Sequence, residues 1–99
     1  MRRSRIGVAG QNVPLHRRLV RFHHLAVDSA VLAVSVEEGS PAASAGLRPG
    51  DLVVSFAEQP VAGIDDLQRL LTGERAGQAV PMSVLRGKDK LELSVTPHA

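Results

Sequence analysis

Short apolar runs separated by glycine, proline and polar turns make up most of the chain. Residues 31–36 and 52–56 are apolar runs, each with a single serine, of the length that buried strands have. Residues 80–85 and 91–95 flank a polar loop, and apolar and polar side chains alternate in the second of them, as in a half-buried strand. Residues 5–10 form a shorter apolar run interrupted by glycine. These patterns predict five or six short strands, the last two joined as a hairpin.

A helix is predicted at about residues 14–25, between the first two strands. Pro14 would open it, since proline is tolerated in the first turn of a helix. Leu15, Leu19 and Phe22 recur at the i, i+4 and i+7 spacing of one helix face, with arginines between them. The segment is therefore expected to be an amphipathic helix that lays this apolar stripe on the core.

Two further helices have clear start and stop signals. The first would have Ser40 as its N-terminal cap, Pro41 at its first position and Gly46 just beyond its end, in a left-handed conformation. The second runs from about Ile64 to Thr72, with two acidic residues in its first turn, where the helix dipole favours negative charge. Gly73 is expected to end it.

The order of these elements predicts an α+β, mainly β, fold. Five or six short strands would form a partly open barrel-like sheet capped by two helices, with the extra helical insertion at about 14–25. The length of 99 residues, with 43% apolar and 22% charged residues, fits one globular domain spanning residues 1–99. No apolar core follows the charges of residues 1–5, so they do not read as a signal peptide. The sequence is expected to be a fragment of a longer protein.

Positive charge is concentrated at the start of the chain. Residues 1–27 carry six arginines and no acidic residue, whereas the remainder carries six basic and ten acidic groups, a balance of −4. An anionic partner is therefore favoured near residues 5–10. The arginines at 17, 18 and 21 could face solvent, dock an acidic neighbouring domain, or bind nucleic acid or anionic lipid. Without interleaved aromatic residues or a membrane-length apolar run, we expect neither a nucleic-acid partner nor direct membrane insertion.

The residues present give little support for a catalytic site. The chain has no cysteine, and Ser44 lies in a segment that lacks the first glycine of the G-x-S-x-G elbow. The four histidines, at 16, 23, 24 and 98, do not have the spacing of metal ligands, and Asp65 and Asp66 look like charges at a helix start. We therefore expect no catalytic residue, no metal site and no cofactor in this chain.

The stretch Gly39-Ser40-Pro41-Ala42-Ala43 … Ala45-Gly46-Leu47-Arg48-Pro49-Gly50-Asp51 resembles the "GSPA…AGL(R/K)PGD" signature of bacterial and mitochondrial PDZ domains. The resemblance is strongest to the PDZ domains of HtrA/Deg-type trypsin-like serine proteases. Ile6-Gly7-Val8 is similar to the carboxylate-binding loop of that family, residues 65–71 to its groove helix, and residues 84–87 with 91–97 to its final hairpin. The resemblance covers almost the whole chain.

The resemblance implies an extended peptide ligand with a free C-terminus. Its carboxylate would lie on backbone N–H groups around Gly7, which side chains leave unshielded, and its backbone would add as a strand to Val8–Gly10. Its last side chain, of branched or modest apolar type, would enter a pocket between the loop and the groove helix. The candidate peptide-binding residues are Arg5, Ile6, Gly7, Val8, Ala9, Gly10, Ile64, Leu67, Gln68 and Leu71.

The resemblance also implies a parent protein and its setting. The chain would be a regulatory or substrate-recognition module of a trypsin-like serine endopeptidase that acts in protein quality control, in the bacterial periplasm or at a membrane. Its partners would be tails of misfolded or substrate proteins and the adjacent protease domain, in a parent that could be oligomeric. The alternative is a PDZ domain for internal docking or oligomer contacts in another bacterial protease or secretion protein. Arg5 stands where the family commonly has an aromatic residue, and it either adds a cation near the carboxylate or faces solvent.

Overall fold

The computed structural model describes residues 7–25, 27–71, 77–87 and 89–97. Within these residues it contains six strands and three helices, which confirms the mainly β, α+β prediction. In chain order they are β1 (Val8–Pro14), α1 (Arg17–Phe22), β2 (Ser29–Val36), α2 (Pro41–Ala45), β3 (Leu52–Phe56), β4 (Gln59–Pro60), α3 (Ile64–Leu70), β5 (Val80–Arg86) and β6 (Asp89–Val95).

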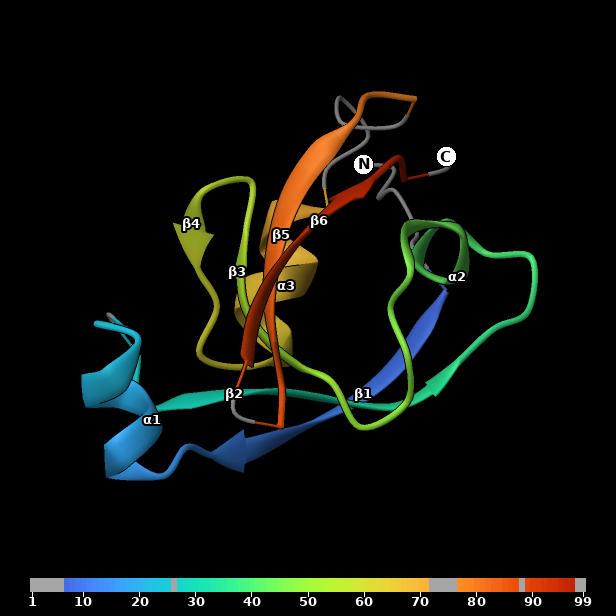
Figure 1. Cartoon of the computed structure of the whole chain (residues 1–99). Coiled ribbons are helices and arrows are strands. Elements are labelled where there is room, and N and C mark those ends of the chain that lie inside the picture. The colour runs from blue at the N-terminus through green and yellow to red at the C-terminus, as the bar shows by residue number, and fades with distance from the viewer. Residues whose placement is uncertain (1–6, 26, 72–76, 88, 98–99) are drawn as a thin grey trace.

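All six strands belong to one antiparallel sheet. Its order is β1-β2-β3-β5-β6, with the short β4 paired to β3. Figure 1 shows β1 and β2 running together across the lower part of the molecule, while β3, β5 and β6 rise from them, so the sheet bends strongly. The strand β1 therefore lies at one edge of the sheet, with α1 near its end and α2 near its start.

Neighbouring residues of the central strands pack into two different apolar clusters. Val53 belongs to the larger cluster, whereas Val54 belongs to the smaller one, and both are buried. The same division separates Val84 from Leu85, because consecutive residues of a strand point to opposite faces of the sheet. The larger cluster includes Leu67 of α3, so α3 covers one face of the sheet. The other face is covered by the α1 segment, which is Leu15 together with α1.

The segment before α1 differs from its prediction. Pro14 is the last residue of β1, where it pairs with Ser29, and the helix begins only at Arg17. An edge strand tolerates proline because no ladder bond is lost on the solvent side. The side chain of His16 caps α1, its Nδ1 accepting a hydrogen bond from the backbone N–H of Arg18 at 3.1 Å. The prediction that Pro14 opens the helix was therefore wrong.

The apolar stripe of this helix is shorter than predicted. Leu15 is buried in the smaller cluster, and Leu19 packs against it. Phe22, by contrast, is 73% exposed, so its predicted place in the stripe was wrong. The helix has only six residues and ends at Phe22, and it therefore does not continue far enough over the sheet to bury this third position.

The remaining elements lie close to their predicted places. The Ser40 Oγ accepts a hydrogen bond from the Ala43 N–H at 3.2 Å as the cap of α2, and Gly46 ends that helix with a φ of 96°. The final hairpin is longer than predicted, because Arg86 pairs with Asp89 and shortens the polar loop. The predicted stop of α3 at Gly73 lies outside the described residues.

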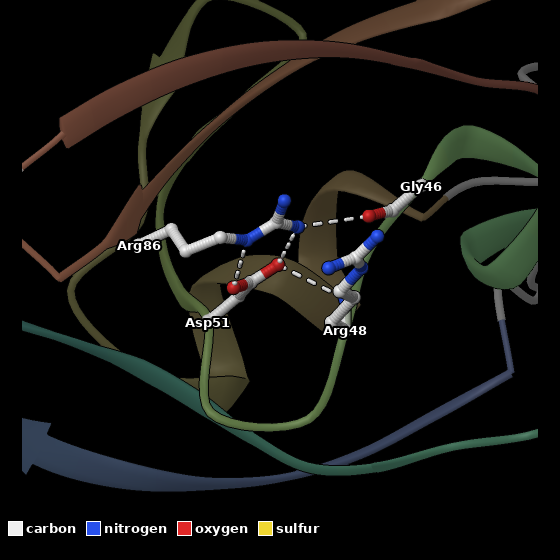
Figure 2. A network of polar contacts seen from close by, with 4 residues as sticks. All are labelled: Gly46, Arg48, Asp51 and Arg86. Atoms are coloured by element: carbon white, nitrogen blue, oxygen red, sulfur yellow. Dashed lines mark hydrogen bonds and ion pairs between the residues drawn. The ribbon is translucent and has the colours of Figure 1, made fainter.

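A buried ion pair joins β5 to the turn that follows α2 (Figure 2). The Asp51 carboxylate is 2% exposed and accepts hydrogen bonds from Arg86, with 2.9 Å from Nε to Oδ1 and 2.7 Å from Nη2 to Oδ2. The same Nη2 also donates to the Gly46 carbonyl, and the Arg48 N–H donates to Oδ2, both at 2.9 Å. Burial alone would raise the pKa of Asp51, but these hydrogen bonds and the charge of Arg86 outweigh it and leave that pKa below its ordinary value.

Candidate functional site

The loop before β1 rests on the turn that precedes α2. Gly7 has a φ of 79°, a conformation that side-chain-bearing residues rarely adopt, and its carbonyl accepts a hydrogen bond from the Glu37 N–H at 2.8 Å. A Cβ placed on Gly7 would lie 2.3 Å from the Ser40 Cβ. Gly7 and Ser40 belong to two motifs that are far apart in the sequence, and the structure packs one directly against the other.

The strand that follows this loop has an open edge. β1 pairs only with β2 among the described residues, in a register that places Val8 opposite Val36 and Ala9 opposite Ser35. A shift between Ala9 and Gly10 then places Gly10 opposite Ala33. In an antiparallel ladder, alternate residues direct their N–H and C=O groups to opposite sides, so the outer edge of β1 presents groups that another chain can pair with.

The apolar face of α3 lies near the start of this strand. Leu67 and Leu71 are buried members of the larger cluster, and Val8 and Ile64 are partly buried and pack against it. Of the predicted site residues, the structure thus brings together Val8, Ile64, Leu67 and Leu71. Arrangements of this kind, an open strand edge beside an apolar helix wall, can hold an extended peptide and sort its side chains.

The other predicted site residues have different surroundings. Ala9 and Gln68 are exposed, and Gly7 and Gly10 are partly buried. Arg5 and Ile6 lie outside the described residues. The role of Arg5 therefore stays a prediction.

A polar contact between β1 and α3 escaped the sequence predictions. The Asn12 Oδ1 accepts a hydrogen bond from the backbone N–H of Ile64 at 2.7 Å. No local sequence pattern predicts a contact between residues so far apart in the chain. The one available signal is Gly63, which precedes the helix and offers no side chain to cap it.

Ser44 lies in a separate hollow between α2 and the end of β6. The hollow has a volume of about 300 Å³ and is lined by Gly39, Pro41, Ser44, Ala45, Ser94 and Thr96. Among the residues that the structure describes, no side chain lining this hollow can act as a base toward the exposed Ser44 hydroxyl. In the parts of the chain that the structure describes, no helix is long and apolar enough to cross a membrane.

Comparison with known proteins gives one family. A family model described as "PDZ domain" matches residues 5–96. A probable periplasmic serine endoprotease, DegP-like, from Chlamydia trachomatis is 37% identical over 85 residues, which are 85% of this chain and 16% of that protein. A putative zinc metalloprotease of Mesorhizobium japonicum is 38% identical over 67 residues, which are 68% of this chain and 18% of that protein. The chain thus spans less than a fifth of these relatives.

Solved structures share the same fold. The HtrA3 PDZ domain bound to a phage-derived ligand (FGRWV) has a TM-score of 0.72 and 25% identity, with 96% of this chain and 85% of that chain covered. The HtrA-type protease AlgW with a decapeptide has a TM-score of 0.75 and 25% identity, with 97% of this chain and 29% of that chain covered. The resemblance that the sequence showed is confirmed by these matches.

Proposed function

The chain is a PDZ domain, and we propose that it binds C-terminal peptide tails that add as a strand to the outer edge of β1. The observation that carries the proposal is the position of that edge. It begins directly after the left-handed Gly7 and lies beside the apolar wall of α3. A peptide in this place would gain main-chain hydrogen bonds from the strand and apolar contacts from the helix.

The carboxylate of the peptide would be held by the loop around Gly7. Successive N–H groups in a turn that includes a left-handed residue form a concave site for anions. Gly7 is held there by the hydrogen bond that its carbonyl accepts from the Glu37 N–H and by its close approach to Ser40, so this residue need not be positioned when the ligand arrives. This is the reason to expect a preference for a free C-terminus.

The last side chain of the peptide would contact Val8, Leu67 and Leu71. These side chains are aliphatic, and two of them are already buried in the larger cluster, which leaves a shallow apolar surface. A branched or modest-sized apolar residue such as valine, leucine or isoleucine is therefore expected at the peptide terminus. The HtrA3 PDZ domain bound to the ligand FGRWV and the AlgW structure with a decapeptide support peptide binding as the role of this domain.

The parent protein is proposed to be a trypsin-like serine endopeptidase of the periplasm or membrane surface. Relatives described as periplasmic serine endoproteases support this, although the chain matches only 16% of the C. trachomatis protein. In such a parent, the domain would tether substrate tails or sense them and shift the adjacent protease domain between resting and active arrangements.

The binding proposal is tested with one peptide in two forms. A pentapeptide ending in valine is titrated as the free acid and as the C-terminal amide, with an alanine-only pentapeptide acid as a control for the side-chain preference. Hydrogen bonds to a charged group contribute about 1.5–3 kcal/mol, so amidation is expected to weaken binding by about ten- to a hundredfold. Equal affinity for the acid and the amide would overturn the proposal.

A second candidate function is internal docking in a different kind of protease. The match to a putative zinc metalloprotease favours it, because related PDZ domains also stand in that class of protein. The sequence of the full-length protein distinguishes the two kinds of parent. A trypsin-like domain with His, Asp and Ser supports the first proposal, and a zinc-binding protease domain supports the second. Failure of the isolated domain to bind any free-acid peptide would favour docking.

A further inference from the structure

The side chain of Asn12 crosses from β1 to the first turn of α3. Its Oδ1 accepts a hydrogen bond from the Ile64 N–H at 2.7 Å, between residues 52 positions apart in the chain. A backbone N–H can only donate, so this partner fixes the orientation of the amide, with its oxygen toward the helix. Asn12 is exposed, and the contact lies at the surface between the two elements.

The helix α3 has no cap from its own sequence. Gly63 stands at the N-cap position and has no side chain to offer. The Asp66 Oδ2 accepts a hydrogen bond from the Ala62 N–H at 3.0 Å, which fixes the preceding loop but leaves the N–H of Ile64 to another partner. The first N–H groups of a helix have no intrahelical acceptors, so Asn12 supplies from the opposite strand what the local sequence lacks.

Gly63 also lets the two elements approach closely. A Cβ at this position would lie 3.0 Å from the Asn12 Oδ1 and 3.2 Å from its Cγ. The φ of Gly63 is −167°, an extended conformation open to any residue, so the close approach rather than the backbone conformation explains the glycine. The hydrogen bond thus sits in a closely fitted contact.

The two ends of the space between β1 and α3 are held by different forces. Near the start of β1, Val8 packs against the cluster that contains Leu67 and Leu71. Near its end, where Gln11 and Asn12 are exposed, the hydrogen bond between Asn12 and Ile64 joins β1 to α3 directly. Ser29 of the neighbouring β2 also holds the loop before the helix, its Oγ donating to the Ala62 carbonyl at 2.7 Å. We propose that Asn12 is a positioning residue that fixes the distance between β1 and α3 before a peptide binds.

This inference rests on the proposed peptide-binding function and adds a determinant to it. A strand added antiparallel to β1 with its last residue opposite Val8 has its fifth residue from the end opposite Asn12. The contact between Asn12 and Ile64 therefore lies at the level where a five-residue tail leaves the groove. Without it, the Ser29 contact still ties the preceding loop to β2, but the direct link that sets the spacing between β1 and α3 is lost, and a peptide must set that spacing at a cost in affinity.

The test compares Asn12→Ala and Asn12→Asp with Gln59→Ala, an exposed control in β4 that lies outside the proposed binding edge. Affinity for the valine-ended pentapeptide acid is measured by calorimetry, together with hydrogen exchange of the Ile64 amide and the stability of each variant to urea. Asn12→Ala is expected to weaken binding about five- to tenfold and to speed exchange at Ile64. Asn12→Asp keeps an acceptor, and its charge suits a helix start, so its affinity should stay within about twofold of the wild type, as should that of Gln59→Ala.

The outcomes separate the two proposals. Wild-type protein that binds no free-acid peptide would overturn the proposed function. Wild-type protein that binds, with Asn12→Ala binding equally well, would overturn the positioning role alone. Should Asn12→Ala be poorly folded, Gly63→Ala provides a second test, because its added Cβ would lie 3.0 Å from the Asn12 Oδ1 and the side chain would have to shift by a few tenths of an ångström. Undiminished affinity in folded Gly63→Ala would count equally against the inference.

Discussion

Arg86 holds both carboxylate oxygens of Asp51, the one buried acidic residue among those the structure describes. The pair joins β5 to the turn between α2 and β3 (Figure 2). Among the described residues, Arg86→Ala would leave the buried carboxylate with the hydrogen bond from the Arg48 N–H and the nearby charge of Arg48. Because a buried charge that loses its main partner is costly, we expect Arg86→Ala to lower the free energy of unfolding, measured by urea denaturation.

Arg69 provides the matched control for that substitution. It also pairs with an aspartate, Asp66, at 3.2 Å, but its side chain is 75% exposed. Arg69→Ala should change the free energy of unfolding by less than about 0.5 kcal/mol. Similar losses for the two arginines would contradict the view that burial of Asp51 gives its pair the larger effect.

The pH dependence of stability should carry a contribution from Asp51. Its pKa in the folded protein lies below 3.8, the ordinary value that it takes when unfolded. Below about pH 4 the unfolded chain therefore binds a proton that the folded chain does not, and the free energy of unfolding falls as the pH drops through the folded pKa. Urea denaturation at pH 7 and at about pH 3 should show a smaller difference for Asp51→Asn than for the wild type. An equal difference would refute the contribution.

Substitution of Gly7 should destabilise the domain as well as disturb its loop. Gly7→Ala combines a φ of 79° with a Cβ 2.3 Å from that of Ser40, so we expect a loss of about 2–4 kcal/mol in the free energy of unfolding. Gly77→Ala is the control, because its φ is 80° and its Cβ would meet no described residue within 4 Å. The difference between the two variants measures the clash with Ser40. Equal losses would show that only the backbone conformation matters.

Truncation to alanine should affect the unfolding free energy differently at Leu15, just before α1, and at Phe22, the last residue of α1. Leu15 is buried in the smaller cluster, and Leu15→Ala should cost about 2–4 kcal/mol in unfolding free energy. Phe22→Ala should cost less than about 0.5 kcal/mol, because the ring is 73% exposed. Thermal denaturation of the two variants compares them directly, and a large loss for Phe22→Ala would contradict its exposed position.

Local signals in the sequence predicted the central part of the fold well. Ser40, Pro41 and Gly46 act where their chemistry is strongest, at the two ends of a short helix, and the structure places them as expected. The prediction at Pro14 was wrong because proline suits the end of an edge strand as well as the start of a helix. The pairing of Pro14 with Ser29, a residue of another strand, decides between the two, and no local pattern shows that pairing. Phe22 misled because a spacing pattern does not tell how long a helix will be.

The predictions for the candidate site show the same difference: features set by local spacing were predicted, and contacts set by the tertiary fold were missed. The aliphatic wall of α3 follows from its leucine spacing, and Val8, Leu67 and Leu71 do meet in one cluster. Asn12 was missed because its partner Ile64 depends on how the sheet folds against the helix, which no short motif contains. Likewise, the contact of Gly7 with Ser40 joins two motifs that could be identified singly but not placed against each other.

Because the core is divided into two clusters, mutations can change the stability of the domain separately from its peptide selectivity. The smaller cluster, around Leu15 and Leu85, lies on the face of the sheet away from α3. A substitution there would lower the fraction of molecules that are folded without changing the affinity of those that are. In a cell, where unfolded molecules are removed by proteolysis, the abundance of the domain and its selectivity could therefore evolve by independent mutations.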